Sequence, residues 1–446
     1  MTIAGRSVVA ALAAIVSALL LTGCAQLSNL MGTASRGELP TAPASVTPAV
    51  AESPQTAPGR ALPPEDKAVP ASVSLPEESR SAPVPPPTPR SALPGVTRTV
   101  SAAVPAAARL YREVTLTEDI TWRGEIAVEG SVTVAPQTTL TLEPGTVVRF
   151  RRTVAGIDRG PVLLVQGRIV ARGNEAAPVL FASAFADPLA GDWQGIVLLA
   201  TEKKNSFEHS RIEGAIIGLD AAFSSVTLKE TSFRACAIGG RFQDSVFALT
   251  GGGASGCGLG VELDESEADI REASFRGNGS GVAGRNGSLA LEGVLCADNR
   301  ETGVSLAGTR LKVSASIFDT NGQGIVLSGC EGSIGRSRIA ANREVGVSLT
   351  ASRVKLFGNE IVRNGVVGLK VDDGRGVAWG NTFAGNGRYD IACSGSDDFR
   401  AIANWWGEAA PSALEQRITQ TGSGRVLTAP ALAARPPALN LNSIAK

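Results

Sequence analysis

An asparagine recurs at a nearly constant spacing of about 22 residues through the second half of this 446-residue chain, a period typical of repeat proteins. The members of the series are Asn278, Asn299, Asn321, Asn342, Asn364 and Asn386. Three positions before them stand Phe275, Cys296, Phe318, Ile339, Ile361 and Phe383. In a repeat architecture each unit buries its apolar side against the units before and after it.

Each repeat also contains the alternation of a half-buried β-strand. A glycine and an aliphatic residue follow the asparagine, and a second aliphatic residue comes two positions later, as in Gly324-Ile325 and Leu327. A period of two places these side chains on one face of a strand. Stacked in register, such units pair every strand with its neighbours and leave edges only at the two ends. The sequence therefore predicts an all-β fold, a single-stranded parallel β-helix with coils of ~22 residues. We expect the helix to be right-handed, because crossover connections between parallel strands are right-handed.

The asparagine series has a structural role in this fold. At a turn between short strands, an inward asparagine can bond backbone groups and its counterpart in the next coil, about 4.8 Å away. A leucine-rich repeat shares the repeat length and one asparagine per unit. It requires a leucine two residues before the aligned apolar position, where this chain has Ala273, Ser316, Ser337 and Asn381. The β-helix is therefore favoured.

The first residues have the features of an export signal. Arg6 precedes an apolar run over residues 8–21, which is short for a membrane span. The segment Leu21-Thr22-Gly23-Cys24 resembles the bacterial lipoprotein signal, in which the cysteine is acylated after cleavage. We therefore expect a signal peptide over 1–23, lipidation of Cys24 and a membrane partner through the lipid. The alternative is an ordinary secretory signal with an incidental cysteine.

The lipoprotein resemblance also implies a location. Neither Ala25 nor Gln26 is the aspartate that resembles an inner-membrane retention mark, so the cell envelope, and within it the outer membrane, is expected. Proline, alanine and serine dominate the segment after Cys24, which cannot bury enough apolar surface to order itself. Residues 24–108 are therefore expected to form the lipidated, disordered tether, 109–408 the β-helix, and 409–446 a C-terminal cap and tail.

Two cysteines continue the asparagine series toward the N-terminus. Cys257 and Cys236 precede Asn278 at the same spacing as the asparagines. Adjacent coils would bring their α-carbons within disulfide range, and an exported protein permits oxidation. Buried thiols that substitute for asparagine are the alternative. The chain has a single histidine and no CxxC pair, so no metal site is predicted.

Segments at both ends of the repeat region carry a family resemblance. They are Leu142-Glu143-Pro144-Gly145-Thr146, Gly191-Asp192-Trp193-Gln194-Gly195 and Ala403-Asn404-Trp405-Trp406-Gly407. They resemble the entry and exit regions of secreted bacterial right-handed β-helix proteins of the pectate-lyase-like superfamily, over about residues 110 to 435. The resemblance implies the fold far more than any activity. Trp405 and Trp406 are expected to close the last coil rather than to stack on a sugar.

The superfamily's enzymes resemble one another in aspartate pairs combined with histidine, arginine or calcium-binding segments. This chain has Asp372-Asp373 and Asp397-Asp398 without a matching histidine, since His209 lies many coils earlier. Two carboxylates can still act as acid and base, and calcium can bind at acidic turns. Because turns favour aspartate for backbone reasons too, we assign no catalytic residue and expect no cofactor.

Basic residues recur at roughly the coil spacing. They are Lys312, Arg336, Arg353, Lys355, Arg375 and Arg400. Stacked on one face, they would form a stripe suited to an acidic polysaccharide, although solvated outward positions explain them as well. Lysine plus arginine equals aspartate plus glutamate at 42 each, so no global field recruits nucleic acid.

The expected function is that of a non-enzymatic cell-envelope lipoprotein, whose β-helix is a scaffold that contacts cell-surface or extracellular polysaccharide. The competing hypothesis is a polysaccharide lyase or hydrolase with an unrecognised carboxylate site. A third hypothesis is that of a periplasmic copper-insertion accessory protein, because the chain also resembles periplasmic β-helix proteins that assist copper insertion. One histidine and two methionines supply few ligands for copper and disfavour it.

Overall fold

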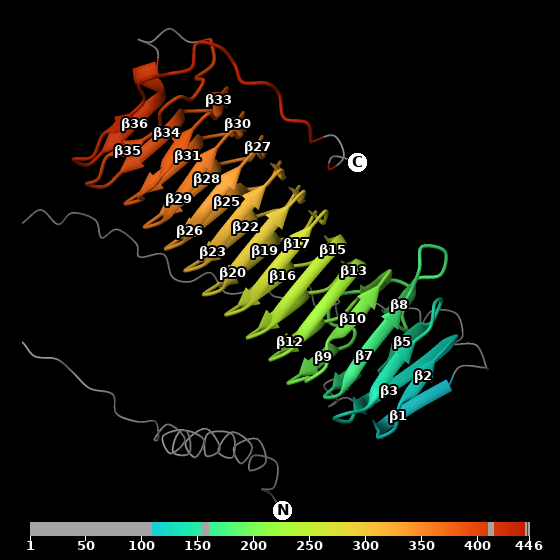
Figure 1. Cartoon of the computed structure of the whole chain (residues 1–446). Helices are drawn as coiled ribbons and strands as arrows, with labels where there is room; N and C mark the ends of the chain where they lie inside the picture. Colours follow the sequence, from blue (N-terminus) through green and yellow to red (C-terminus); the bar gives the residue numbers. More distant parts are fainter. Residues whose placement is uncertain (1–108, 153–159, 409–413, 442–443, 445–446) are drawn as a thin grey trace, which may run out of the picture. The chain divides into compact units, whose positions relative to one another are not determined.

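The computed structural model describes residues 109–152, 160–408, 414–441 and 444. The expected signal peptide, Cys24 and the tether lie outside the described residues. Within them, parallel strands stack coil upon coil, so that Figure 1 shows the strand labels ascending from β1 to β36 in sequence order. No helix in this part of the chain is long and apolar enough to cross a membrane.

Each coil contributes one strand segment to each of three faces. Face A contains the strands that precede the asparagine turn: the first halves of β1 (Arg109–Leu116) and β3 (Glu125–Val134), β5 (Val147–Arg151), β8 (Val179–Ser183), β11 (Ser210–Glu213), the second halves of β13 (Ser225–Arg234) and β15 (Val246–Ser255), β18 (Ser274–Arg276), β21 (Leu295–Ala297), β24 (Ile317–Asp319), β27 (Arg338–Ala340), β30 (Glu360–Val362) and β33 (Thr382–Ala384).

Face B follows the asparagine turn. It contains the second halves of β1 and β3, β6 (Val162–Val165), β9 (Gly195–Leu199), β12 (Ile217–Ala222), β14 (Ile238–Gln243), β16 (Leu259–Asp264), β19 (Ser280–Arg285), β22 (Thr302–Ala307), β25 (Gln323–Ser328), β28 (Val345–Thr350), β31 (Val367–Asp372), β34 (Tyr389–Ser394) and β36 (Ile418–Thr421).

Face C completes each coil. It contains β2 (Ile120–Trp122), β4 (Thr139–Leu142), β7 (Arg168–Arg172), β10 (Asn205–Glu208), the first halves of β13 and β15, β17 (Glu267–Arg271), β20 (Ser288–Glu292), β23 (Arg310–Ser314), β26 (Glu331–Gly335), β29 (Arg353–Phe357), β32 (Val377–Trp379), β35 (Phe399–Arg400) and β37 (Val426–Leu427). The described residues therefore form a parallel β-solenoid of about 13 coils, as predicted.

The core is a column of side chains enclosed by the three faces. The residues three positions before the asparagines, from Phe275 to Phe383, are all fully buried, as the repeat predicts. Aromatic rings stack between coils in this column, as with Phe150 and Trp193, whose ring centroids lie 3.7 Å apart. Near the end of the stack Trp406 lies on Phe383 at 4.9 Å, with 13° between the ring planes.

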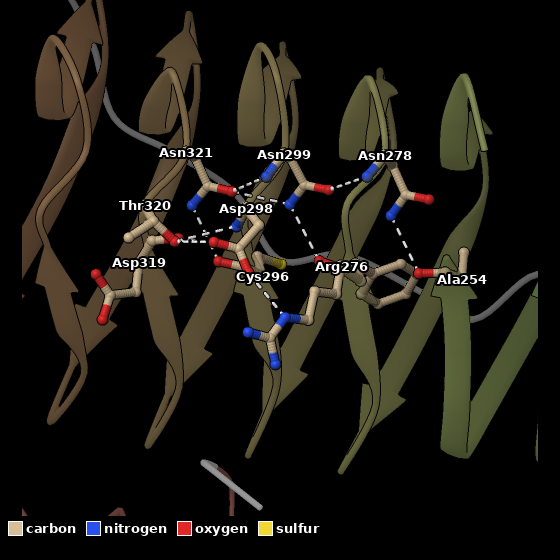
Figure 2. Close-up of polar contacts among 10 residues, drawn as sticks. Ala254, Arg276, Asn278, Cys296, Asp298, Asn299, Asp319, Thr320 and Asn321 are labelled. Carbon is tan, nitrogen blue, oxygen red and sulfur yellow. Dashed lines mark hydrogen bonds and ion pairs between the residues drawn. The ribbon is translucent and has the colours of Figure 1, made fainter. Parts of the chain in front are cut away.

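The predicted asparagine ladder is present at the turn from face A to face B (Figure 2). Asn299 donates hydrogen bonds from its backbone N and its Nδ2 to Oδ1 of Asn321, at 3.1 and 2.8 Å. Its Nδ2 also donates to the backbone oxygen of Phe275 at 3.0 Å. Each side-chain amide thus satisfies buried backbone groups of the preceding coil, which a short turn cannot do alone.

A second ladder occupies the turn from face C to face A. Ser337 N donates to Oδ1 of Asn359 at 3.0 Å, and Asn359 Nδ2 donates to Oδ1 of Asn381 at 3.0 Å. Ser316 begins this series and Asn404 ends it. Serine and asparagine fill the same place because either side chain supplies one acceptor oxygen to a backbone N–H. Their interchange hides the period from a search for one residue type.

The C-terminal end of the solenoid continues past residue 408. After η2 (Glu415–Arg417), β36 pairs with β34 and β37 pairs with β35. Arg417 lies 3.1 Å from the carboxylate of Asp390, whose side chain is 3% exposed. Residues 418–427 thus cover the strand edges that the last full coil would otherwise leave open.

Candidate functional site

Three of the predicted basic residues share one column on the outer surface of face C. Register pairs Lys312 with Ser333, Ser333 with Lys355, Lys355 with Val377, and Val377 with Arg400. Lys312, Lys355 and Arg400 are exposed, and none of them forms an ion pair with another described residue. We call Lys312, Ser333, Lys355, Val377 and Arg400 the cationic column. It alternates a cation with a smaller uncharged side chain.

The other three basic residues do not join this column. Arg353 lies 3.6 Å from Glu331, and Arg375 lies 2.7 Å from Asp397, so each is matched by a carboxylate. Arg336 lies beyond the end of β26 in a left-handed turn with φ 49°. The stripe expected from coil spacing is therefore narrower than the sequence indicates.

A shallow groove adjoins the column on face C. Its volume is about 480 Å³, and it is lined by Ala268, Ser288, Leu289, Ala290, Arg310, Leu311, Lys312, Glu331 and Gly332. The small residues Ser288 and Ala290 form the floor of the groove on the outer surface of β20. Their register partners on the next coil, Arg310 and Lys312, have long side chains and form one side of the groove. The groove therefore combines a low floor with two cations at one side.

The candidate catalytic aspartates are divided among different structural roles. Burial alone would raise the pKa of Asp372, but hydrogen bonds from Lys370 and Ser394 outweigh burial and hold that pKa below its ordinary value. Asp398 accepts a hydrogen bond from the backbone N of Arg425 at 2.8 Å. A carboxylate with a lowered pKa is ionised at neutral pH, so Asp372 is unsuited to act as a general acid.

Asp373 and Asp397 do lie together in a second cavity. This cavity, of about 440 Å³ at the turn from face B to face C, is also lined by Glu331, Arg353 and Arg375. The described residues contain no group of three or more histidine, cysteine, aspartate or glutamate side chains that could hold a metal ion. The cavity thus offers three carboxylates, and two of them, Glu331 and Asp397, are each paired with an arginine.

Cys236 and Cys257 occupy the asparagine position of their coils. The backbone N of Cys257 donates to Oδ1 of Asn278 at 2.9 Å, so the two cysteines continue the asparagine ladder. Both thiols are buried and free in the structure, and a hydrogen bond with Cys257 together with burial holds the pKa of Cys236 well above its ordinary value. The disulfide stays a prediction, which thiol counting by mass, with and without reductant, would test.

The terminal tryptophans are engaged within the protein. Trp406 is 8% exposed against Phe383, and the guanidinium of Arg435 lies 5.6 Å from the centre of the Trp405 ring. A different aromatic pair, Phe357 and Trp379, stacks on the outside of face C. The sequence analysis did not identify this pair. The register between coils would have indicated it, because each ring lies two residues after a member of the cationic column.

Two family models match the solenoid. Residues 111–220 match a pectate-lyase like β-helix domain, and residues 257–405 match a right-handed β-helix region, which agrees with the predicted winding. The comparison with curated proteins gave no match.

Solved structures of two epimerases are distantly similar. The periplasmic alginate epimerase AlgG is 13% identical, with a TM-score of 0.46 over 68% of this chain and 77% of that one. The A-module of the Azotobacter vinelandii mannuronan C-5 epimerase AlgE4 is 14% identical, with a TM-score of 0.36 over 71% of this chain and 90% of that one.

Proposed function

We propose that this chain, a right-handed β-helix protein of the pectate-lyase-like superfamily, is a non-enzymatic cell-envelope lipoprotein that contacts an acidic polysaccharide through face C. In this proposal Cys24 carries the lipid, residues 24–108 form the tether, and the solenoid is a rigid scaffold. The outer membrane is the proposed location. The observation that carries the ligand proposal is the cationic column.

The spacing of the column suits a linear ligand. Coils repeat about every 4.8 Å, so cations on alternate coils recur about every 10 Å along the solenoid. Lys312, Lys355 and Arg400 are not neutralised by any described carboxylate, unlike Arg353 and Arg375. Since the whole chain carries 42 charges of each sign, attraction for an anion must come from such a local set. A polysaccharide with carboxylates at regular intervals matches this set.

Retention on a uronic-acid polymer tests the proposal. We expect the full chain to be retained at low salt and released at high salt, because exposed charges are screened over a Debye length of about 10 Å at 0.1 M salt. The variant Lys312→Gln/Lys355→Gln/Arg400→Gln should bind about tenfold more weakly, since three exposed contacts of about 0.5 kcal/mol each amount to that factor.

The matched control changes two arginines that already have partners. Arg353→Gln/Arg375→Gln removes charge from the same region but leaves the cationic column intact. This variant should bind within about twofold of the unchanged protein. Retention that does not depend on salt, or equal losses in the two variants, would contradict a role for the column.

A lyase or hydrolase is the second candidate function. The cavity that holds Asp373 and Asp397 favours it, because two carboxylates in one concave site can supply an acid and a base. Incubation with uronic-acid polymers, with and without calcium, followed by detection of new reducing or unsaturated ends, separates the two functions. Product formation that Asp397→Asn abolishes would establish the enzyme and overturn the non-enzymatic proposal.

A further inference from the structure

Phe357 and Trp379 form an aromatic pair on adjacent coils of face C. They are register partners at the ends of β29 and β32, with ring centroids 5.2 Å apart and 20° between the ring planes. Trp379 is 37% exposed, whereas Trp122 and Trp193 are fully buried and Trp406 is 8% exposed. The fold uses those three tryptophans in its core, whereas more than a third of the Trp379 side chain is open to solvent.

The neighbouring coils explain both the stack and its exposure. Below the pair, Gly335 is the register partner of Phe357, and a Cβ added there would overlap the Phe357 ring. The glycine thus makes room for the ring against the backbone of β26. Above the pair, β35 ends at Arg400, which pairs with Val377, two residues before Trp379. No strand of the described chain therefore pairs with Trp379 from the far side, although Gly380 N donates to the backbone oxygen of Ala403 at 2.8 Å, so the chain after β35 runs past the pair and leaves Trp379 partly exposed.

The pair lies beside the cationic column. Side chains two residues apart in a strand share a face, so Phe357 lies next to Lys355 on the outer surface of β29. By the same argument Trp379 lies next to Val377, and Val377 separates Lys355 from Arg400 in the column. An open aromatic surface is thus bordered by two cations that no described carboxylate neutralises. This combination occurs on one contiguous part of face C.

We propose that Phe357 and Trp379 form a stacking subsite for one sugar ring of a uronic-acid polysaccharide, with Lys355 and Arg400 binding the carboxylates of that ring and its neighbour. The inference rests on the proposed function and names the ligand class more narrowly. A pyranose ring presents an apolar C–H face and a polar edge, which match an aromatic surface beside cations. A polyanion without rings would use the cations alone.

Binding measurements on the full chain separate the aromatic contribution from the charges. The probes are an oligouronate, a neutral oligosaccharide of equal length and polyglutamate. Trp379→Ala should weaken oligouronate binding about tenfold, as expected for loss of an aromatic contact of roughly 1.5 kcal/mol, and leave polyglutamate binding unchanged. Trp379→Phe keeps a ring and should retain most of the affinity. The neutral oligosaccharide should bind weakly or not at all.

Fluorescence gives a second readout that does not depend on Trp379→Ala folding well. Trp379 is far more exposed than Trp122, Trp193 and Trp406, so oligouronate should change the emission of the unchanged protein. Trp379→Phe should lose most of that change while it still binds. The matched control Trp405→Phe should keep the change, because Arg435 already lies over the Trp405 ring.

The outcomes distinguish the subsite from the wider proposal. If the unchanged protein binds neither polyanion, the proposed function and the subsite both fail. If it binds oligouronate but Trp379→Ala binds equally well, the cationic column stands and the subsite fails. Equal losses for oligouronate and polyglutamate, or tight binding of the neutral oligosaccharide, would also overturn stacking of a charged sugar.

Discussion

Asn321 connects two coils through one side chain. Its Nδ2 donates to the backbone oxygen of Cys296 at 2.9 Å, and its Oδ1 accepts from the backbone N of Asn299 at 3.1 Å. Asn321→Ala leaves these two buried groups unpaired, at about 1–3 kcal/mol each, so we expect a loss of about 2–6 kcal/mol in unfolding free energy. Urea denaturation followed by circular dichroism measures it.

The control for this variant is an amide on the solvent side of the same coil. Gln323 donates to Glu344 at 2.8 Å in an exposed position, and surface changes of this kind shift stability by about 0.5 kcal/mol or less. If Gln323→Ala and Asn321→Ala destabilise equally, the ladder does not have the role described.

At the residue scale, the sequence predicted those inward positions at which the same residue type recurs from coil to coil. The Asn278 to Asn386 ladder has a constant residue and a nearly constant step, so its inward position could be predicted. The ladder from Ser316 to Asn404 was missed because it begins with two serines and changes to asparagine at Asn359. Salt bridges such as Arg375–Asp397 were missed as well, because they depend on side-chain directions at irregular turns.

Gly253 allows one strand to serve two faces. β15 passes from face C to face A through Gly251, Gly252 and Gly253, and Gly253 has φ 131°, a region that only glycine adopts readily. A Cβ at Gly253 would also overlap the backbone oxygen of Ser274 in the next coil. Gly253→Ala should therefore lower the unfolding free energy by about 2–5 kcal/mol, from backbone strain and overpacking together.

Gly256→Ala is the matched control for this glycine. Gly256 has φ 64° in the following turn, and an added Cβ would meet nothing within 4 Å. Only the left-handed backbone conformation opposes alanine there, at a cost of about 1–2 kcal/mol. Thermal melts of both variants compare the two costs, and a larger drop for Gly256→Ala would contradict the crowding inferred at Gly253.

At the scale of the element, strands with one buried face followed from the period-two alternation, and the structure confirms such strands on three faces. The alternation did not predict which of the basic residues would lie together on one face. Lys312 and Lys355 belong to strands and fall in one column, whereas Arg336 lies past the end of β26 in a turn. Ser333 occupies the column in the coil of Arg336, and Arg336 follows it by three residues, so the approximate coil spacing was not enough to place this arginine.

Residues 409–446 should keep the solenoid from associating with itself. A chain that stops at residue 408 exposes the edges of β34 and β35 and leaves Asp390 without Arg417. Open strand edges pair with other chains, so we expect oligomers in light scattering and a lower melting temperature. A chain that stops at residue 441 keeps β36 and β37 and should behave as the full chain does. Monomers from both chains would argue against capping.

Over the whole molecule, the expected order of signal, tether and solenoid rests on composition and period, and of these three parts the structure describes the solenoid alone. The surface proposed to bind a ligand could not be predicted in this way. It depends on register between coils, which brings Lys355 beside Val377 and Phe357 beside Trp379, although a whole coil of chain separates the members of each pair. Register of this kind is set by the turn lengths of every coil together.

The cationic column repeats every two coils, from Lys312 through Lys355 to Arg400. A long ligand displaced along the solenoid by two coils would meet cations at the same spacing again but would lose the Phe357–Trp379 pair, because Ser314 stands two coils before Phe357 in the register. Positions that use the cations alone would then have similar free energies, so a chain bound in them would keep translational freedom. Such a protein would slide along a polysaccharide strand more readily than it would leave it, and its residence time would lengthen with the length of the polymer.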